Sequence, residues 1–214
     1  MSQFAQLERP LASRAGTERR RLERQARSLA WGGIAYHLVE FAVAIAAGVA
    51  AGSIALIGFG ADSLIEALAG AVVLWLFTGA RVGSGAAERR AQQLIAVSFF
   101  VLAFYIGIES ARSLVGGHEP SASWVGVGLA AFTAVTMPLL AFVKRRVGRQ
   151  LGSAATVQEA SQTQLCAYLS VALLAGLLAN AAAGWWWTDP LAALVIAGVA
   201  VREGATSWRG ESCC

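Results

Sequence analysis

Apolar stretches of roughly 20 residues, separated by short basic segments, dominate this sequence. A helix needs about 20 apolar residues to cross the hydrocarbon core of a bilayer, which is about 30 Å thick. Only 14% of the residues are charged and 57% are hydrophobic, whereas a soluble domain usually carries about a quarter charged residues. The sequence therefore predicts an all-α polytopic membrane protein.

Six such stretches predict six transmembrane helices. We expect them at about 29–50, 53–77, 94–115, 124–143, 159 or 162–183, and 189–201, with Pro138 as a kink in the fourth. Residues 1–28 lack the apolar core of a signal peptide, and we expect them to form a basic arm on the cytoplasmic lipid surface. The predicted domains are this arm, a transmembrane domain at 29–203 and a short tail at 204–214.

The basic residues predict the orientation. Every Lys and Arg except Arg112 falls in the N-terminal arm, the second connection, the fourth connection or the tail. Cytoplasmic connections are enriched in Lys and Arg, so we expect both termini on the cytoplasmic side of an inner membrane. The net charge of +4 follows this topology and does not indicate a nucleic-acid partner.

Two carboxylates lie in the middle of the second span. Asp62 and Glu66 are four residues apart, so they share one helical face, about 6 Å from each other. An ionisable side chain at the centre of a membrane costs about 3 kcal/mol and usually marks function. These carboxylates are therefore candidate ligands for a cation.

The first two spans form a tight hairpin, because little more than Ala51 and Gly52 separates them. Folding about that turn brings Glu40 level with Ser63, and His37 level with Glu66. We therefore add His37 and Glu40 to the candidate ligands. The alternative is that these two side chains, one turn apart, form a purely structural pair.

A polar stripe marks the fifth span. It contains Glu159, Gln162, Thr163, Cys166 and Ser170, which recur at helical spacing and must face a partner helix or a water-filled cavity. Hydrogen bonding between helices is one interpretation. Ligation is the other, since a cysteine thiolate is a soft metal ligand.

The cysteines do not form a disulfide framework, and we expect Cys166, Cys213 and Cys214 to be reduced thiols. Cys213 and Cys214 indicate a reactive tail, with capture of a metal ion as the alternative. Asp189, before Pro190, is expected to cap the sixth span, or else to serve cation entry from outside.

Three segments resemble the cation diffusion facilitator, or cation efflux, family. GSIALIGFGADSLIEALAG resembles its second transmembrane helix, CAYLSVALLAGLLANAAAGWWW the fifth helix of a bacterial branch, and TDPLAALVIAGVAVREG the sixth helix. The resemblance implies six spans and exchange of a divalent transition metal, most often zinc, for protons. It also implies a homodimer and no resident cofactor.

The resemblance places the metal site on the second and fifth spans. It carries directly to Asp62 and Glu66. Gln162 and Cys166 stand where the family has a His and an Asp, so this chain departs from the pattern there. We expect His37 or Glu40 to compensate, and Glu159 to contribute. The chain also resembles a short branch without the soluble C-terminal domain.

The sequence thus predicts a divalent metal transporter, a metal/proton antiporter for efflux, and not an enzyme, because no catalytic motif is visible. Two alternatives stay open. One is a membrane protein that binds metal or acts as a scaffold without transport. The other is an exporter of organic cations that uses the carboxylates against an ammonium group.

Overall fold

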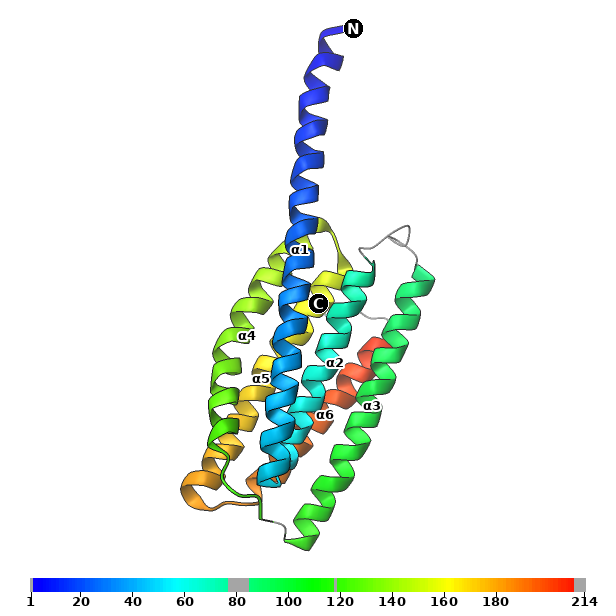
Figure 1. The fold of residues 1–214 in the computed structure, drawn as a ribbon. Helices are drawn as coiled ribbons and strands as arrows, with labels where there is room; N and C mark the ends of the chain where they lie inside the picture. The colour runs from blue at the N-terminus through cyan, green and yellow to red at the C-terminus, as the bar shows by residue number, and fades with distance from the viewer. Residues whose placement is uncertain (1, 77–84, 118, 210–214) are drawn as a thin grey trace.

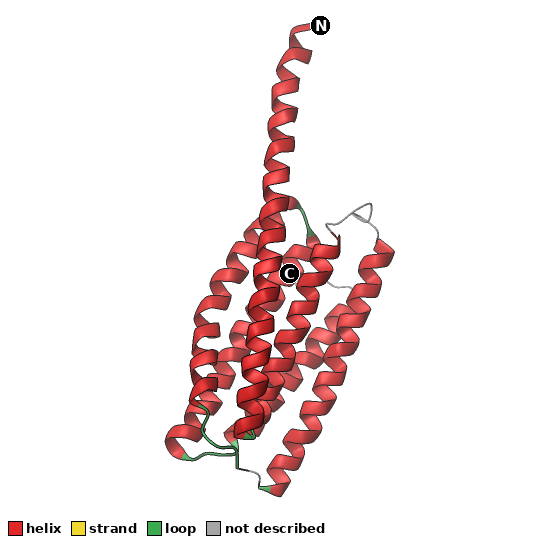
Figure 2. Ribbon diagram, viewed as in Figure 1, coloured by secondary structure: helices red, strands yellow, loops and turns green. Residues whose placement is uncertain are grey.

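The computed structural model describes residues 2–76, 85–117 and 119–209, and all regular structure in them is helical (Figure 2). The helices are α1 (Ser2–Ala51), α2 (Ile54–Leu76), α3 (Gly85–Gly116), α4 (Trp124–Leu151), α5 (Ala154–Ala183) and α6 (Thr188–Arg209). Each of these six contains a stretch long and apolar enough to cross a membrane. The predicted all-α polytopic fold is confirmed.

The helices form one bundle in which successive helices run in opposite directions (Figure 1). The most extensive contacts join α1 to α2, α4 to α5, and α3 to α6. With six alternating helices, the start of α1 and the end of α6 point to the same side of the membrane. We refer to that side, predicted to be cytoplasmic, as the inner end, and to the opposite side as the outer end.

Besides α1, four helices extend further at the inner end than the apolar pattern predicted. α3 begins at Gly85, α4 ends at Leu151, α5 begins at Ala154 and α6 ends at Arg209. Basic residues expected in connections or in the tail therefore lie on helices, since Arg is a good helix former. Cys213, Cys214 and Arg81 lie outside the described residues.

The basic arm belongs to α1, which is a single helix of 50 residues. Its N-terminal half projects beyond the bundle in line with the rest of the helix (Figure 1). The arm thus continues the direction of the first span. Its expected place on the cytoplasmic lipid surface stays a prediction.

Two hairpins have turns of the same geometry, α1–α2 at the outer end and α4–α5 at the inner end. Gly52 and Gly152 have φ angles of 68° and 65°, a conformation that only glycine adopts at little cost. In the first turn the Ser53 N–H donates to the Gly48 carbonyl at 2.9 Å, and in the second the Ser153 N–H donates to the Gly148 carbonyl at 3.0 Å. These bonds satisfy carbonyls at the ends of α1 and α4.

The core lies between the helices at the middle and outer end of the bundle. Its fully buried apolar side chains include Leu56, Phe59, Ile106, Leu173 and Ile196. Apolar side chains of α4 are exposed along one face, as expected of a surface in contact with lipid: Phe132, Val135, Leu139 and Phe142. α4 continues through Pro138 without a break in its helical assignment.

Candidate metal centre

The α1–α2 hairpin has the register that the sequence predicted. Ser63 Oγ donates to Glu40 Oε2 at 2.9 Å, and His37 Nδ1 lies 3.4 Å from Glu66 Oε2. All four residues are buried. The depth argument therefore places these side chains correctly, and the structure adds that they face each other.

Glu40 is held by hydrogen bonds on both carboxylate oxygens. Oε2 accepts from Ser63 and lies 3.2 Å from His37 Nδ1. Oε1 accepts from Thr133 of α4 and from Tyr36 OH at 3.3 Å. A carboxylate with this many partners is stable when buried. Glu40 is thus engaged by protein groups on α1, α2 and α4.

The position of Glu40 determines how His37 is presented. A histidine that ligates a metal commonly donates its other ring N–H to a carboxylate, which fixes its tautomer and orientation. When His37 Nδ1 carries the proton, it donates to Glu40 and leaves the lone pair of Nε2 available. Within the described residues, buried Nε2 has no hydrogen-bond partner.

His37, Glu66 and Cys166 bring their ligand atoms together. One potential ligand atom from each of the three residues lies within 4.8 Å of the other two, and all three side chains are buried. Among described residues, Glu66 Oε2 also lacks a hydrogen-bond partner. A buried polar atom without a partner is destabilising, so this cluster has unused capacity for a ligand.

Asp62 and Gln162 flank the cluster. Both are buried, but neither is part of the group of three. Asp62 is one turn from Glu66 toward the outer end of α2, about 6 Å along the axis. Gln162 is one turn from Cys166 toward the inner end of α5. The sequence predicts both as ligands. In the structure each lies one helical turn from the member of the cluster on its own helix, Glu66 or Cys166.

Glu159 has a partner that the sequence analysis did not identify. Lys144 Nζ of α4 donates to Glu159 Oε1 at 2.8 Å and to Thr163 Oγ1 at 3.2 Å. Lys144 is 1% exposed and Glu159 is 5% exposed. Lys144 was expected in a cytoplasmic connection, and that prediction is wrong: it is inside the bundle, where an ion pair compensates its charge.

Two glycines lie beside this ion pair. A Cβ atom at Gly33 of α1 would lie 3.0 Å from Lys144 Nζ, and one at Gly70 of α2 would lie 3.5 Å from Glu159 Oε1. Gly33 precedes His37 by one turn, and Gly70 follows Glu66 by one turn. The Lys144–Glu159 pair therefore lies on the inner side of the cluster, about 6 Å along the helix axes.

The sequence did contain a signal for this pair. Folding α4 and α5 about Gly152 brings Lys144 level with Glu159, by the argument that aligned His37 with Glu66. The signal was missed because the apolar fourth span was ended at Val143, one residue before the first charge.

Asp189 has contacts that the sequence did not predict. It lies in the first turn of α6, but its carboxylate accepts hydrogen bonds from Ser53 Oγ and from the Ile54 N–H, the latter at 2.9 Å. It therefore caps the start of α2, where backbone N–H groups lack partners within the helix. This contact joins α6 to the α1–α2 turn at the outer end.

Comparison with known proteins identifies the family of the chain. The family model of the cation efflux transmembrane domain matches residues 31–208, a range that includes the cluster, the ion pair and at least part of each of the six helices. No curated protein matches the chain. A match over most of the chain, with six helices able to span a membrane, shows that this multi-pass membrane protein belongs to the cation efflux family of transporters.

Proposed function

We propose that the protein exports a divalent transition-metal ion, with zinc as the first candidate, in exchange for protons. The observation that carries this proposal is the buried group of His37, Glu66 and Cys166, whose ligand atoms lie within 4.8 Å of one another. A cation of about 2 Å bond length can bridge such a group after small side-chain adjustments.

The kinds of ligand favour a transition metal. Thiolate and imidazole prefer zinc and similar ions, whereas Mg²⁺ and Ca²⁺ prefer oxygen ligands. An organic cation would have no use for a thiolate beside the carboxylate. Three protein ligands also leave a coordination position open. Asp62, on the outer side of the cluster, can bind the ion at that position as it leaves.

Proton exchange follows from the charge of the ligands. Glu66 and Cys166 carry up to two negative charges when deprotonated, and burying such charges without a cation is unfavourable. A metal-free site is stable when they bind protons, and a metal-bound site requires them deprotonated. Binding of the metal ion thus releases protons from the site, and binding of protons releases the metal ion.

The ion pair of Lys144 and Glu159 supports an alternating mechanism. It lies between the cluster and the inner end, while buried apolar side chains such as Phe59 and Leu173 lie toward the outer end. Access from the inner end then requires the pair to separate, and access from the outer end requires the apolar packing to loosen. Movement of helix pairs around a fixed site is the usual way such transporters alternate.

The membrane, the direction and the assembly are further parts of the proposal. The basic residues favour a cytoplasmic inner end, so export would begin there, across an inner membrane. A homodimer follows only from the resemblance to the family. Crosslinking of the protein in membranes would test the dimer separately.

The test is metal uptake into inverted membrane vesicles that contain the wild type, Glu66→Gln, Cys166→Ser or Asp62→Asn. We expect zinc uptake driven by a proton gradient, with Glu66→Gln and Cys166→Ser strongly impaired. The control is Glu109→Gln, since Glu109 forms an exposed ion pair with Arg112 on α3, a helix that contributes no residue to the cluster. Unimpaired uptake by both ligand variants would contradict the site.

Calorimetry separates transport from binding. Wild type should bind zinc and release protons, so the observed enthalpy should differ between buffers of different ionisation enthalpy, and affinity should fall as the pH falls. Binding without flux would identify a metal-binding protein that does not transport. Zinc flux that is independent of the proton gradient would contradict the proposed exchange for protons.

A further inference from the structure

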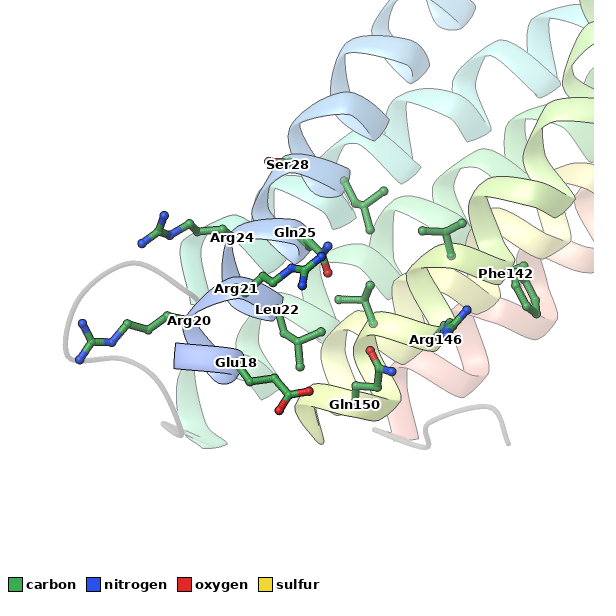
Figure 3. A pocket seen from close by; sticks show the side chains of 13 residues that line it. Glu18, Arg20, Arg21, Leu22, Arg24, Gln25, Ser28, Phe142, Arg146 and Gln150 are labelled. Carbon is green, nitrogen blue, oxygen red and sulfur yellow. The ribbon is translucent and has the colours of Figure 1, made fainter. Parts of the chain in front are cut away.

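A groove of about 970 Å³ lies between the N-terminal half of α1 and the inner end of α4. Figure 3 shows side chains of α1, including Arg21 and Gln25, opposite Arg146 and Gln150 of α4. The metal cluster contributes nothing to its lining. The groove is therefore separate from the proposed transport site.

The groove lies where the lipid-facing surface changes from apolar to polar. The exposed apolar face of α4 ends at Phe142, and Arg146 follows one turn later on the same face. Phe142, Val143 and Leu22 line the groove together with Arg146. Its occupant therefore meets apolar side chains on the bundle side and polar side chains on the inner side.

The polar part of the groove is basic. Arg21 extends from α1 toward α4, whereas the side chains of Arg20 and Arg24 point away from it (Figure 3). Arg146 also contributes to the lining, against the single acid Glu18. Within the described part of the chain, neither Arg21 nor Arg146 forms an ion pair. Their guanidinium groups are free to bind an anion, which arginine can do through two hydrogen bonds.

We propose that this groove binds an anionic phospholipid of the cytoplasmic leaflet. Arg21 and Arg146, from two different helices, bind its phosphate, and Gln25 and Gln150 offer further hydrogen bonds to the headgroup. An acyl chain lies against Phe142 and Val143. Basic pockets between helices at the cytoplasmic surface have the chemistry that acidic lipid headgroups require. A soluble phosphate would use only the basic half of the groove.

The experiment measures lipid retention by the purified full-length protein with native mass spectrometry, using phosphatidylglycerol and phosphatidylcholine. The test variant is Arg21→Gln/Arg146→Gln. The matched control is Arg27→Gln/Arg149→Gln, which removes the same charge from the same two helices at exposed positions outside the groove lining. Melting temperatures without added lipid establish that both variants are folded.

We expect wild type to retain phosphatidylglycerol in preference to phosphatidylcholine. The test variant should bind phosphatidylglycerol about 30-fold more weakly, since each arginine at an acidic lipid surface contributes about 1 kcal/mol and about 1.4 kcal/mol corresponds to tenfold. The control should change little. Inorganic phosphate and glycerophosphate, which have no acyl chains, should not displace the lipid at matched concentration.

Three results would overturn the proposal. Equal losses in both double variants would show general attraction between a basic protein and acidic lipid. Displacement of the lipid by inorganic phosphate or glycerophosphate would assign the groove to a soluble anion. Equal retention of phosphatidylcholine would show that the headgroup charge does not matter.

Discussion

The α1–α2 and α4–α5 hairpins have the same turn but opposite electrostatic outcomes. In the first, the register brings His37 to Glu66 and leaves polar atoms without hydrogen-bond partners among the described residues. In the second, it brings Lys144 to Glu159, whose charges compensate each other at 2.8 Å. The backbone geometry is shared, so the balance of donors and acceptors distinguishes a binding site from a structural ion pair.

The largest expected effect comes from Lys144→Met, which leaves Glu159 buried without its partner. Breaking a buried ion pair costs about 3–5 kcal/mol, whereas replacing both members by neutral groups can be nearly neutral. Unfolding in detergent should show a large loss of unfolding free energy for the single variant. The double variant Lys144→Met/Glu159→Gln should recover most of it. Arg149→Gln, on the exposed surface of the same helix, is the control. A double variant as unstable as the single would contradict the difference between the hairpins.

The shared turn geometry predicts that glycine substitutions in the two hairpins have similar effects. A Cβ atom at Gly48 would lie 3.0 Å from the Ile57 backbone nitrogen, and one at Gly148 would lie 3.0 Å from that of Val157. Gly48→Ala and Gly148→Ala should each lower stability by about 1–3 kcal/mol through overpacking. Gly128→Ala is the control, because no atom lies within 4 Å of its added Cβ. Widely different losses at Gly48 and Gly148 would show that the hairpins are not equivalent.

Glu40→Gln tests whether the first hairpin orients a ligand. Removing the carboxylate that accepts a hydrogen bond from a metal-binding histidine typically lowers metal affinity about 10–100-fold. In Glu40→Gln, His37 is no longer oriented by a carboxylate. Zinc binding measured by calorimetry should fall by that amount, while Glu159→Gln/Lys144→Met should bind zinc with nearly unchanged affinity. Unchanged affinity in Glu40→Gln, with lowered affinity in the double variant, would indicate that the metal binds at the second hairpin.

The smallest expected effect is at the exposed ion pair of α3. Arg112 Nη1 lies 2.6 Å from Glu109 Oε1, and the Arg112 side chain is 72% exposed. Exposed pairs contribute about 0–1 kcal/mol, so Arg112→Gln should hardly change the unfolding transition. A loss as large as that of Lys144→Met would show that burial does not explain the contrast between ion pairs.

The sequence predicted the six helices and the common depth of His37 and Glu66 because both depend on local information. Apolar length determines the spans, and the short turn at Gly52 determines the register of α1 against α2. Proximity of Cys166 to Glu66 depends on how α5 packs against α2, which no turn length specifies. Thr133 gave no signal, since a threonine in an apolar span looks the same whether it faces lipid or Glu40.

The roles of Lys144 and Asp189 were also missed. A lysine at the end of an apolar stretch has the composition of a connection, and only the α4–α5 register places it inside. Asp189 precedes a proline, which indicates a helix start, but the helix that its carboxylate caps is α2. Caps between helices distant in sequence require the tertiary arrangement.

Pro138 lies on α4 between Thr133, which binds Glu40, and Lys144, which binds Glu159. Proline cannot donate a hydrogen bond to the carbonyl four residues earlier, that of Ala134, so bending at this point breaks one fewer bond than elsewhere. α4 therefore contains a natural hinge between its two polar contacts. In the proposed mechanism, bending at this point would move Lys144 with the inner segment while the outer segment keeps Glu40, and through it His37, in position.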